Sequence, residues 1–294
     1  AGIPVAANCT TVNKMCGSGM KATMLSHDLL LAETNEIMVA GGMESMTNTP
    51  YILQKARSGQ RLGHGQMMDH MFLDGLEDAF DKGTLMGVFA ERTAKKYGFS
   101  REAQDEFAIR SLKRAKKAIE DGSFKNEVTP VSYKNRKKET LVELDEQPIT
   151  ANLDKIPNLQ PAFEKDGTVT AANSSSISDG AAALVMMRES TAKKNGFKPI
   201  ARFLGHSSFA QAPEWFTTAP VGAIKGVLKT VEWNVDDVEL FEINEAFAVV
   251  TMAAMNDLDL HAEKVNVHGG ACACLLYTSP SPRDATQSRM PSSA

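Results

Sequence analysis

Apolar residues recur at helical spacing directly after a glycine-rich turn near the start of the chain. Met20 and Met24 begin this pattern, and the apolar, β-favouring run 9–12 precedes the turn. Cys16 is therefore predicted to lie where a strand gives way to a helix. The first turn of a helix presents unpaired N–H groups and partial positive charge, which favour a thiolate and can receive a developing oxyanion. We interpret Cys16 as a nucleophile, and Cys9 as a small buried apolar residue.

The rest of the chain alternates predicted strands and helices. A short apolar run at residues 37–40 ends in two glycines, so residues 5–42 predict a strand, a helix and a strand, the βαβ unit of a parallel sheet. Further helices are predicted over residues 85–94, 101–120 and 190–195, from Pro220 onward, and from Asn244 to about residue 258. Further strands are predicted over residues 182–187, 200–206 and 238–243, with a hairpin over 128–133 and 140–144. This alternation predicts an α/β fold.

Composition narrows the class of protein. With 294 residues, of which 43% are hydrophobic, the chain can bury a substantial core and suits two domains better than one. A net charge of −4 argues against a general nucleic-acid binder. No run approaches the ~18 apolar residues of a membrane span, and the four cysteines show no disulfide-framework spacing. We therefore expect a cytoplasmic protein with no membrane contact. Because the chain begins with Ala1, almost at the candidate nucleophile, we also expect it to be a fragment.

Two motifs carry a family resemblance. Residues 13–19 read Asn-Lys-Met-Cys-Gly-Ser-Gly, and after one predicted helix residues 41–46 read Gly-Gly-Met-Glu-Ser-Met. This pair resembles the nucleophile region of thiolases, the acetyl-CoA C-acetyltransferase family, and the resemblance covers residues 1–273. It implies an α-β-α-β-α layered sandwich of two βαβ-type halves with an inserted loop domain, truncated at both ends. The implied domains are the remainder of the N-terminal half with the nucleophile (1–47), the loop domain covering coenzyme A (48–177), an incomplete C-terminal half (178–273), and a non-native disordered tail (274–294).

The resemblance also implies site residues. Asn244, in an Asn-Glu-Ala-Phe motif, would hold a water that forms an oxyanion hole with a histidine, and Phe247 would form a wall of the acyl pocket. Ser175 would bond a pantetheine amide. Without the resemblance, the asparagine reads as a helix cap and the serine-rich stretch as a tight turn. The implied substrate and coenzyme A contacts are Met86, Phe163, Ala171, Ser174, Ser175 and Phe247.

The implied reaction passes through an acyl-enzyme at Cys16. It is either condensation of two acetyl-CoA molecules to acetoacetyl-CoA or thiolysis of a 3-ketoacyl-CoA. Coenzyme A thioesters are then substrates, no cofactor is bound permanently, and the intact parent is expected to be a homodimer or homotetramer. No metal site is predicted, because Cys272 and Cys274 lack further ligands at suitable spacing. The basic residues of the helix over 101–120 read as a solvated face, or alternatively as attracting the phosphates of coenzyme A.

The chain departs from the family near its end. Leu276 stands where the family has the histidine of Gly-His-Pro, and the second catalytic cysteine is absent. His268 is rejected as a substitute base, because it precedes a glycine pair at a predicted strand end, where a structural histidine is expected. Leu85 replaces a histidine that many relatives place before Met-Gly. We therefore predict little or no turnover by this chain. The alternatives are a decarboxylating condensing enzyme of the ketoacyl-synthase type and a catalytically dead binding or assembly fragment.

Overall fold

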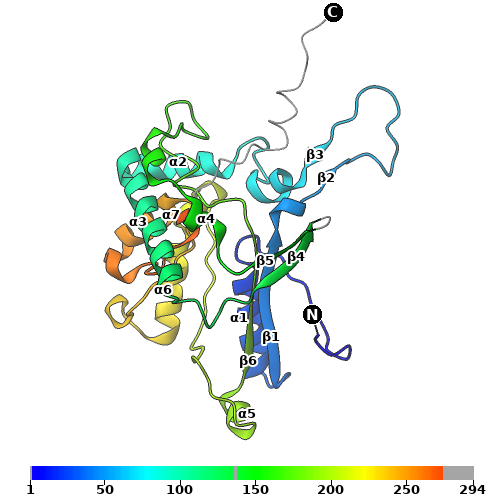
Figure 1. Cartoon of the computed structure of the whole chain (residues 1–294), viewed down its shortest axis with the longest axis vertical. Coiled ribbons are helices and arrows are strands. Elements are labelled where there is room, and N and C mark those ends of the chain that lie inside the picture. Colours follow the sequence, from blue (N-terminus) through cyan, green and yellow to red (C-terminus); the bar gives the residue numbers. More distant parts are fainter. Residues whose placement is uncertain (1, 136–137, 274–294) are drawn as a thin grey trace, which may run out of the picture. The chain divides into compact units, whose positions relative to one another are not determined.

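A computed structural model describes residues 2–135 and 138–273 of the chain (Figure 1). The predicted tail at residues 274–294 and the predicted hairpin turn at residues 136–137 lie outside these described residues. The chain divides into two compact units, Ala1–Thr84 with Ile177–Ser207 and Leu85–Ser176 with Ser208–Ala294. The four domains assigned from the sequence stay a prediction.

The first unit is built on an antiparallel strand pair. The strand β1 (Ile37–Ser45) pairs with β6 (Asp179–Met187) along its whole length, from Ile37 opposite Met187 to Ser45 opposite Asp179. The helix α1 (Ser18–Leu31) packs on this pair and buries Met24 and Leu30. The remaining elements of the unit are η1 (Met46–Asn48), β2 (Tyr51–Ile52), β3 (Met68–Asp69), the π-helical η2 (Phe72–Leu76) and α5 (Glu189–Lys194).

The second unit is mostly helical. Its long helices are α2 (Met86–Tyr97), α3 (Arg101–Glu120), α6 (Ala219–Val231) and α7 (Ala248–Leu258). A hairpin joins β4 (Val131–Asn135) to β5 (Lys138–Val142). The short elements are α4 (Glu146–Thr150), η3 (Leu153–Asn158), η4 (Pro213–Thr218), η5 (Val235–Asp237), η6 (Ala262–Lys264) and η7 (Ala271–Ala273).

The helix α7 occupies the centre of the second unit. It contacts α2, α3 and α6 (Figure 1), and Ala248, Val249, Ala253 and Ala254 are fully buried. Most of its residues are small or branched and apolar, which suits a helix that has neighbours on several sides. Its exposed residues, Asn256 and Asp257, lie near its C-terminal end. Among the described residues, no helix combines the length and the apolar character needed to cross a membrane.

Helix boundaries follow local signals. Gly98 adopts a left-handed conformation (φ +69°) that ends α2, and the Ser100 hydroxyl accepts a hydrogen bond from the Ala103 N–H (3.2 Å) at the start of α3. The predicted helix over residues 101–120 is confirmed, as is the helix begun near Pro220. The helix predicted from Asn244 begins four residues later, at Ala248.

Three predicted strands are wrong. Residues 9–12 and 200–206 form no strand, and of residues 238–243 only Phe241 pairs, in a single bridge with Val265. The predicted parallel βαβ unit is also wrong as drawn, because the partner of β1 within the described part of the chain is the antiparallel β6. An apolar, β-favouring run becomes a strand only where another segment supplies its ladder of hydrogen bonds. Local composition does not report whether such a partner is present.

Candidate active site

Cys16 lies in a closed turn two residues before α1 begins. Met15 adopts a left-handed conformation (φ +52°), and its N–H donates to the Asn13 side chain (2.9 Å). The Ser18 hydroxyl accepts from the Lys14 N–H (2.9 Å) and donates to the Met15 carbonyl (2.7 Å). These bonds fix the backbone on both sides of Cys16, whose side chain is exposed. Cys9 is exposed as well, so its interpretation as a buried apolar residue is wrong.

The helix that follows, α1, has no side-chain cap at its N-terminus. Gly17 is its N-cap residue and no side chain caps it, while the Lys21 N–H donates to the Gly17 carbonyl (2.8 Å) as the first backbone bond of the helix. N–H groups in the first turn of a helix have no partner within the helix, and they carry partial positive charge. The predicted position of Cys16 at the mouth of a helix is confirmed, and the sulfur is not buried in apolar packing.

Glycines seat the start of α1 on the strand pair. A Cβ atom added at Gly19 would lie 3.4 Å from the Gly42 nitrogen, and one added at Gly41 would lie 2.3 Å from the Ala182 carbonyl oxygen. The backbone of β1 therefore approaches α1 closely at Gly19.

In the second unit, two segments that are far apart in the sequence lie side by side. Ser174 and Phe247 form an isolated antiparallel bridge. The Ser175 N–H donates to the Ala246 carbonyl (3.0 Å), and the Ala248 N–H donates to the Asn173 carbonyl (2.8 Å). The serine-rich stretch and the Asn-Glu-Ala-Phe motif, which the sequence treats as separate signals, thus form one structure.

An apolar cluster adjoins this bridge. The rings of Phe163 and Phe247 meet edge to face, with centroids 6.0 Å apart, and Met86 packs against the same cluster. Gly87 makes room for the Phe163 ring, because a Cβ atom at that position would lie 2.3 Å from the ring carbons. The structure therefore brings together Met86, Phe163 and Phe247, and their contact with an acyl or pantetheine group stays a prediction.

The side chains predicted to contact the ligand differ in their exposure to solvent. Ser174 is buried, and its hydroxyl donates to the Thr170 carbonyl (2.7 Å), so this hydroxyl already has a structural partner. Ser175, Ala171 and Asn244 are exposed. Ser175 and Asn244 are therefore the better placed of the polar candidates to meet a ligand. Both belong to the second unit.

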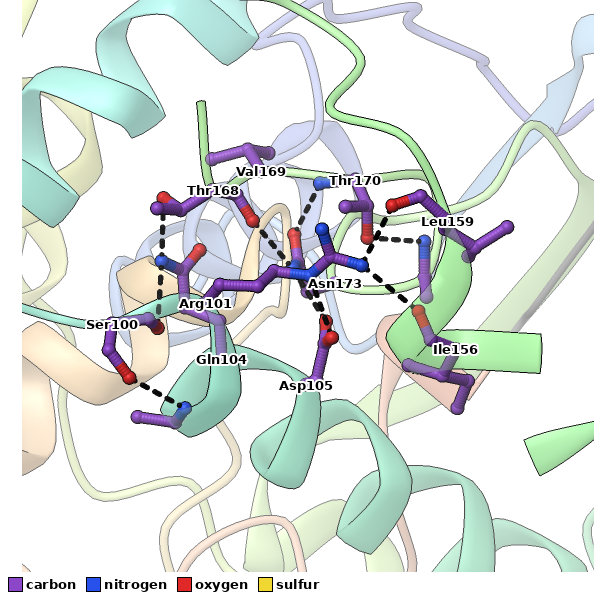
Figure 2. A network of polar contacts seen from close by, with 12 residues as sticks. Ser100, Arg101, Gln104, Asp105, Ile156, Leu159, Thr168, Val169, Thr170 and Asn173 are labelled. Atoms are coloured by element: carbon purple, nitrogen blue, oxygen red, sulfur yellow. Dashed lines mark hydrogen bonds and ion pairs between the residues drawn. The ribbon is translucent and has the colours of Figure 1, made fainter. Parts of the chain in front are cut away.

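A polar network holds the serine-rich stretch in place (Figure 2). The Arg101 side chain pairs with Asp105 (2.7 Å) and donates to two backbone carbonyls at the end of η3 (2.9 and 3.0 Å). The Asn173 amide donates to Asp105 (3.1 Å) and accepts from the Thr170 N–H (2.8 Å). Burial raises the pKa of Asp105, and the bond and charge of Arg101 oppose that rise. The network fixes the backbone directly before Ser174.

Glu245 is a second anchor, and the sequence interpretation missed it. Its side chain is 1% exposed and accepts hydrogen bonds from the Ser111 hydroxyl (2.7 Å), the Asn266 amide (2.8 Å) and the Cys272 N–H (2.9 Å). The sequence contains one signal for this role: Glu245 is a charged residue in a largely apolar run directly before α7. Glu245 ties Asn244, its neighbour in the chain, to the segment that ends the described structure.

His268 is exposed and its ring meets Phe124 edge to face at 5.5 Å. The segment around it is a turn rather than the predicted strand end: Asn266 has φ +47° and its carbonyl accepts from the Gly269 N–H (2.9 Å). Position 276, where the family places a histidine, lies outside the described residues.

Comparisons with known proteins agree across both units. Residues 1–190 match the family model "Thiolase, N-terminal domain" and residues 197–275 match "Thiolase, C-terminal domain". Acetyl-CoA acetyltransferase IB of Candida tropicalis is 45% identical over 276 residues, which are 93% of this chain and 68% of that protein. A probable acetyl-CoA acyltransferase of Staphylococcus aureus is 42% identical, over 92% of this chain and 70% of that one.

Two solved structures share the fold. The acetyl-CoA acetyltransferase of Bacillus anthracis superposes with a TM-score of 0.85 at 40% identity, covering 90% of this chain and 68% of that one. The Acat5 thiolase from Ascaris suum, solved in complex with coenzyme A, gives 0.87 at 38% identity, covering 92% and 69%. These superpositions confirm the expected α/β thiolase fold. The chain belongs to the thiolase family.

Proposed function

We propose that the chain accepts acyl groups from coenzyme A thioesters on Cys16. The observation that carries this proposal is the exposed sulfur of Cys16, held in a closed turn two residues before a helix N-terminus that no side chain caps. The names of the relatives, acetyl-CoA acetyltransferase and acetyl-CoA acyltransferase, support the same chemistry, as does the coenzyme A complex of the Ascaris thiolase.

The acylation step follows from this geometry. The Cys16 thiolate attacks the thioester carbonyl carbon, a new C–S bond forms, and the bond to the coenzyme A sulfur breaks so that coenzyme A leaves as a thiolate. Negative charge develops on the carbonyl oxygen during the attack. At the start of α1 the Ser18 N–H is already bonded to the Met15 carbonyl (3.1 Å), so the N–H groups of Gly19 and Met20 are proposed to receive this charge.

The second step consumes the acyl-enzyme. In condensation, an enolate of a second acetyl-CoA attacks the acyl carbon and releases the Cys16 thiolate and acetoacetyl-CoA. In thiolysis the same steps run in reverse, beginning from a 3-ketoacyl-CoA. Asn244, exposed at the entrance to α7, is proposed to hold the water that stabilises the enolate oxygen.

The pantetheine arm is proposed to lie along the bridge between Ser174 and Phe247. Ser175 is exposed there and offers its hydroxyl to an amide, while Phe163 and Phe247 supply an apolar wall beside it. Ala171 offers a small exposed surface, and Met86 completes the wall. We further propose a cytoplasmic location and a homodimeric or homotetrameric assembly, as expected from the sequence.

Complete turnover requires a proton carrier in addition to the nucleophile. The chain contains neither a Gly-His-Pro motif nor a later Cys-x-Gly segment. General acid–base catalysis contributes roughly 10²–10⁴-fold to the rate of such a step. We therefore propose that this chain forms the acyl-enzyme but completes little or no turnover.

The test is acyl-enzyme formation from acetyl-CoA. The protein is incubated with acetyl-CoA, digested, and mapped by mass spectrometry for an acetyl thioester. We expect acetylation of Cys16 that is lost in Cys16→Ser and retained in Cys9→Ser, since Cys9 is a second exposed thiol in the same unit. Equal acetylation of Cys9 and Cys16, or none on Cys16, would overturn the proposal.

A further inference from the structure

Two histidines and an aspartate converge on the far half of α1, away from the Cys16 turn. His27 and Asp28 belong to α1, and His206 comes from the segment that follows α5, so all three lie in the first unit. One side-chain ligand atom from each residue lies within 4.8 Å of the other two. The acyl-transfer proposal uses none of these residues. His206 and Asp28 are 178 positions apart in the chain, so no short sequence motif predicts the cluster.

The distances in the cluster suit a shared ion. His206 Nε2 lies 2.8 Å from Asp28 Oδ1, and His27 Nδ1 lies 3.7 Å from the same oxygen. With metal–ligand bonds of roughly 2.0–2.1 Å, the ligand atoms of a tetrahedral site are about 3.3 Å apart. The two separations that involve Asp28 lie on either side of this value, and all three ligand atoms lie within 4.8 Å of one another. Side-chain rotations would bring the three atoms onto one ion.

His27 supplies the strongest indication that a partner belongs there. Its Nδ1 atom is buried and, among the described residues, makes no hydrogen bond; it faces the Asp28 carboxylate at 3.7 Å, beyond hydrogen-bond distance. Its ring packs against Phe203, with centroids 4.5 Å apart, so the ring orientation is held from the other side. A buried ring nitrogen without a partner costs free energy, and a bound ion is one of the few groups that would satisfy it.

The Asp28 carboxylate is the ligand of this cluster that a cation reaches first from solvent. The Asp28 side chain is 54% exposed, whereas His27 and His206 are 15% and 23% exposed. The cluster is therefore open to solvent on the Asp28 side and enclosed on the imidazole side.

We propose that His27, Asp28 and His206 form a binding site for a zinc-class divalent ion, with water as the fourth ligand. Two imidazoles and one carboxylate suit zinc, whereas calcium and magnesium prefer all-oxygen sites. The ion joins the segment at residues 200–206 to α1. Its role is to crosslink these segments of the first unit, and no step of acyl transfer passes through it.

Zinc titration of the chelator-treated full chain by calorimetry tests the site. We expect one equivalent bound, and a loss of affinity of at least about tenfold in Asp28→Asn and in His206→Gln. His70→Gln is the matched control, because His70 also contacts a carboxylate, Asp74, at 2.5 Å in the first unit but belongs to no three-ligand cluster among the described residues. This control is expected to bind as tightly as the unmodified chain.

Two further measurements keep the proposal falsifiable if a variant folds poorly. In the unmodified chain, zinc must shift the NMR ring signals of His27 and His206 and leave those of His70 unchanged. Cobalt substitution must give no thiolate charge-transfer band, which separates this site from binding by the free cysteines. Absence of zinc binding, unchanged affinity in Asp28→Asn and His206→Gln, or a bound cobalt ion that shows thiolate bands would overturn the proposal.

Discussion

Gly19 in α1 and Gly42 in β1 touch backbone to backbone: a Cβ atom added at Gly42 would lie 3.0 Å from the Gly19 Cα. Only residues without side chains permit this approach. The first turn of the helix therefore rests directly on the strand, and Cys16, three residues earlier, takes its position from that contact.

Alanine substitutions of glycines in β1 and β6 should destabilise the protein more, the closer the added Cβ atom lies to neighbouring atoms. At Gly41 the added carbon would lie 2.3 Å from a backbone oxygen of β6, at Gly42 it would lie 3.0 Å from α1, and at Gly180 it would meet nothing within 4 Å. Overpacking costs about 1–3 kcal/mol. We expect urea unfolding to show the largest loss for Gly41→Ala, a smaller one for Gly42→Ala and little change for Gly180→Ala. Equal losses at all three positions would contradict the packing described.

Replacement of Glu245 by alanine should destabilise the second unit. Three donors, on Ser111, Asn266 and Cys272, would lose their buried acceptor. We expect the free energy of unfolding to fall by about 2–4 kcal/mol, because each unsatisfied buried group carries a desolvation cost. The exposed Glu239→Ala is the control and should stay within about 0.5 kcal/mol of the unmodified chain. A similar small effect in both variants would refute the anchoring role.

Tyr97 should ionise at a higher pH than an exposed tyrosine. Burial, then the hydrogen bond of its hydroxyl to Asp257 (2.8 Å) and the charge of that carboxylate, raise its pKa to about 12. A folded-state pKa above the unfolded value, about 10, gives stability that is complete below pH 10 and is lost as pH rises through the folded value. Tyrosinate absorbance should show a late step that Tyr97→Phe removes and Asp257→Asn moves to lower pH. A step unchanged by either substitution would contradict this environment.

Helices were predictable from local signals, as α3 illustrates. Its apolar face repeats at helical spacing, Gly98 ends the preceding helix, and Ser100 caps the next one. All of these interactions join residues within one or two turns of each other, so the sequence contains both partners. The same reasoning predicted α2 and α6.

Strands were less predictable because their partners are distant. The strand β1 pairs with β6 about 140 residues later, and nothing within either segment specifies an antiparallel ladder. Residues 200–206 have an apolar, strand-like composition but no partner ladder among the described residues, and they form no strand. Whether such a segment becomes a strand therefore depends on a distant partner segment, which local composition does not specify.

The candidate site was predictable only in part. The position of Cys16 directly before a helix is confirmed, because the residues of one motif specify it, whereas the contact of Phe163 with Phe247 was not predicted. The commitment of the Ser174 hydroxyl to Thr170 and the three bonds to Glu245 were not foreseen. Hydrogen-bond partners of this kind depend on tertiary packing, and a motif does not reveal which of its polar groups are already satisfied.

The most direct test compares the alkylation rates of Cys9 and Cys16, the two exposed thiols among the described residues. Iodoacetamide should modify Cys16 faster than Cys9 in the same chain, because only Cys16 lies at a helix N-terminus. Acetyl-CoA should protect Cys16 and leave Cys9 unprotected. Alkylation of Cys16 no faster than that of Cys9, with no protection by acetyl-CoA, would contradict an activated nucleophile that accepts acyl groups.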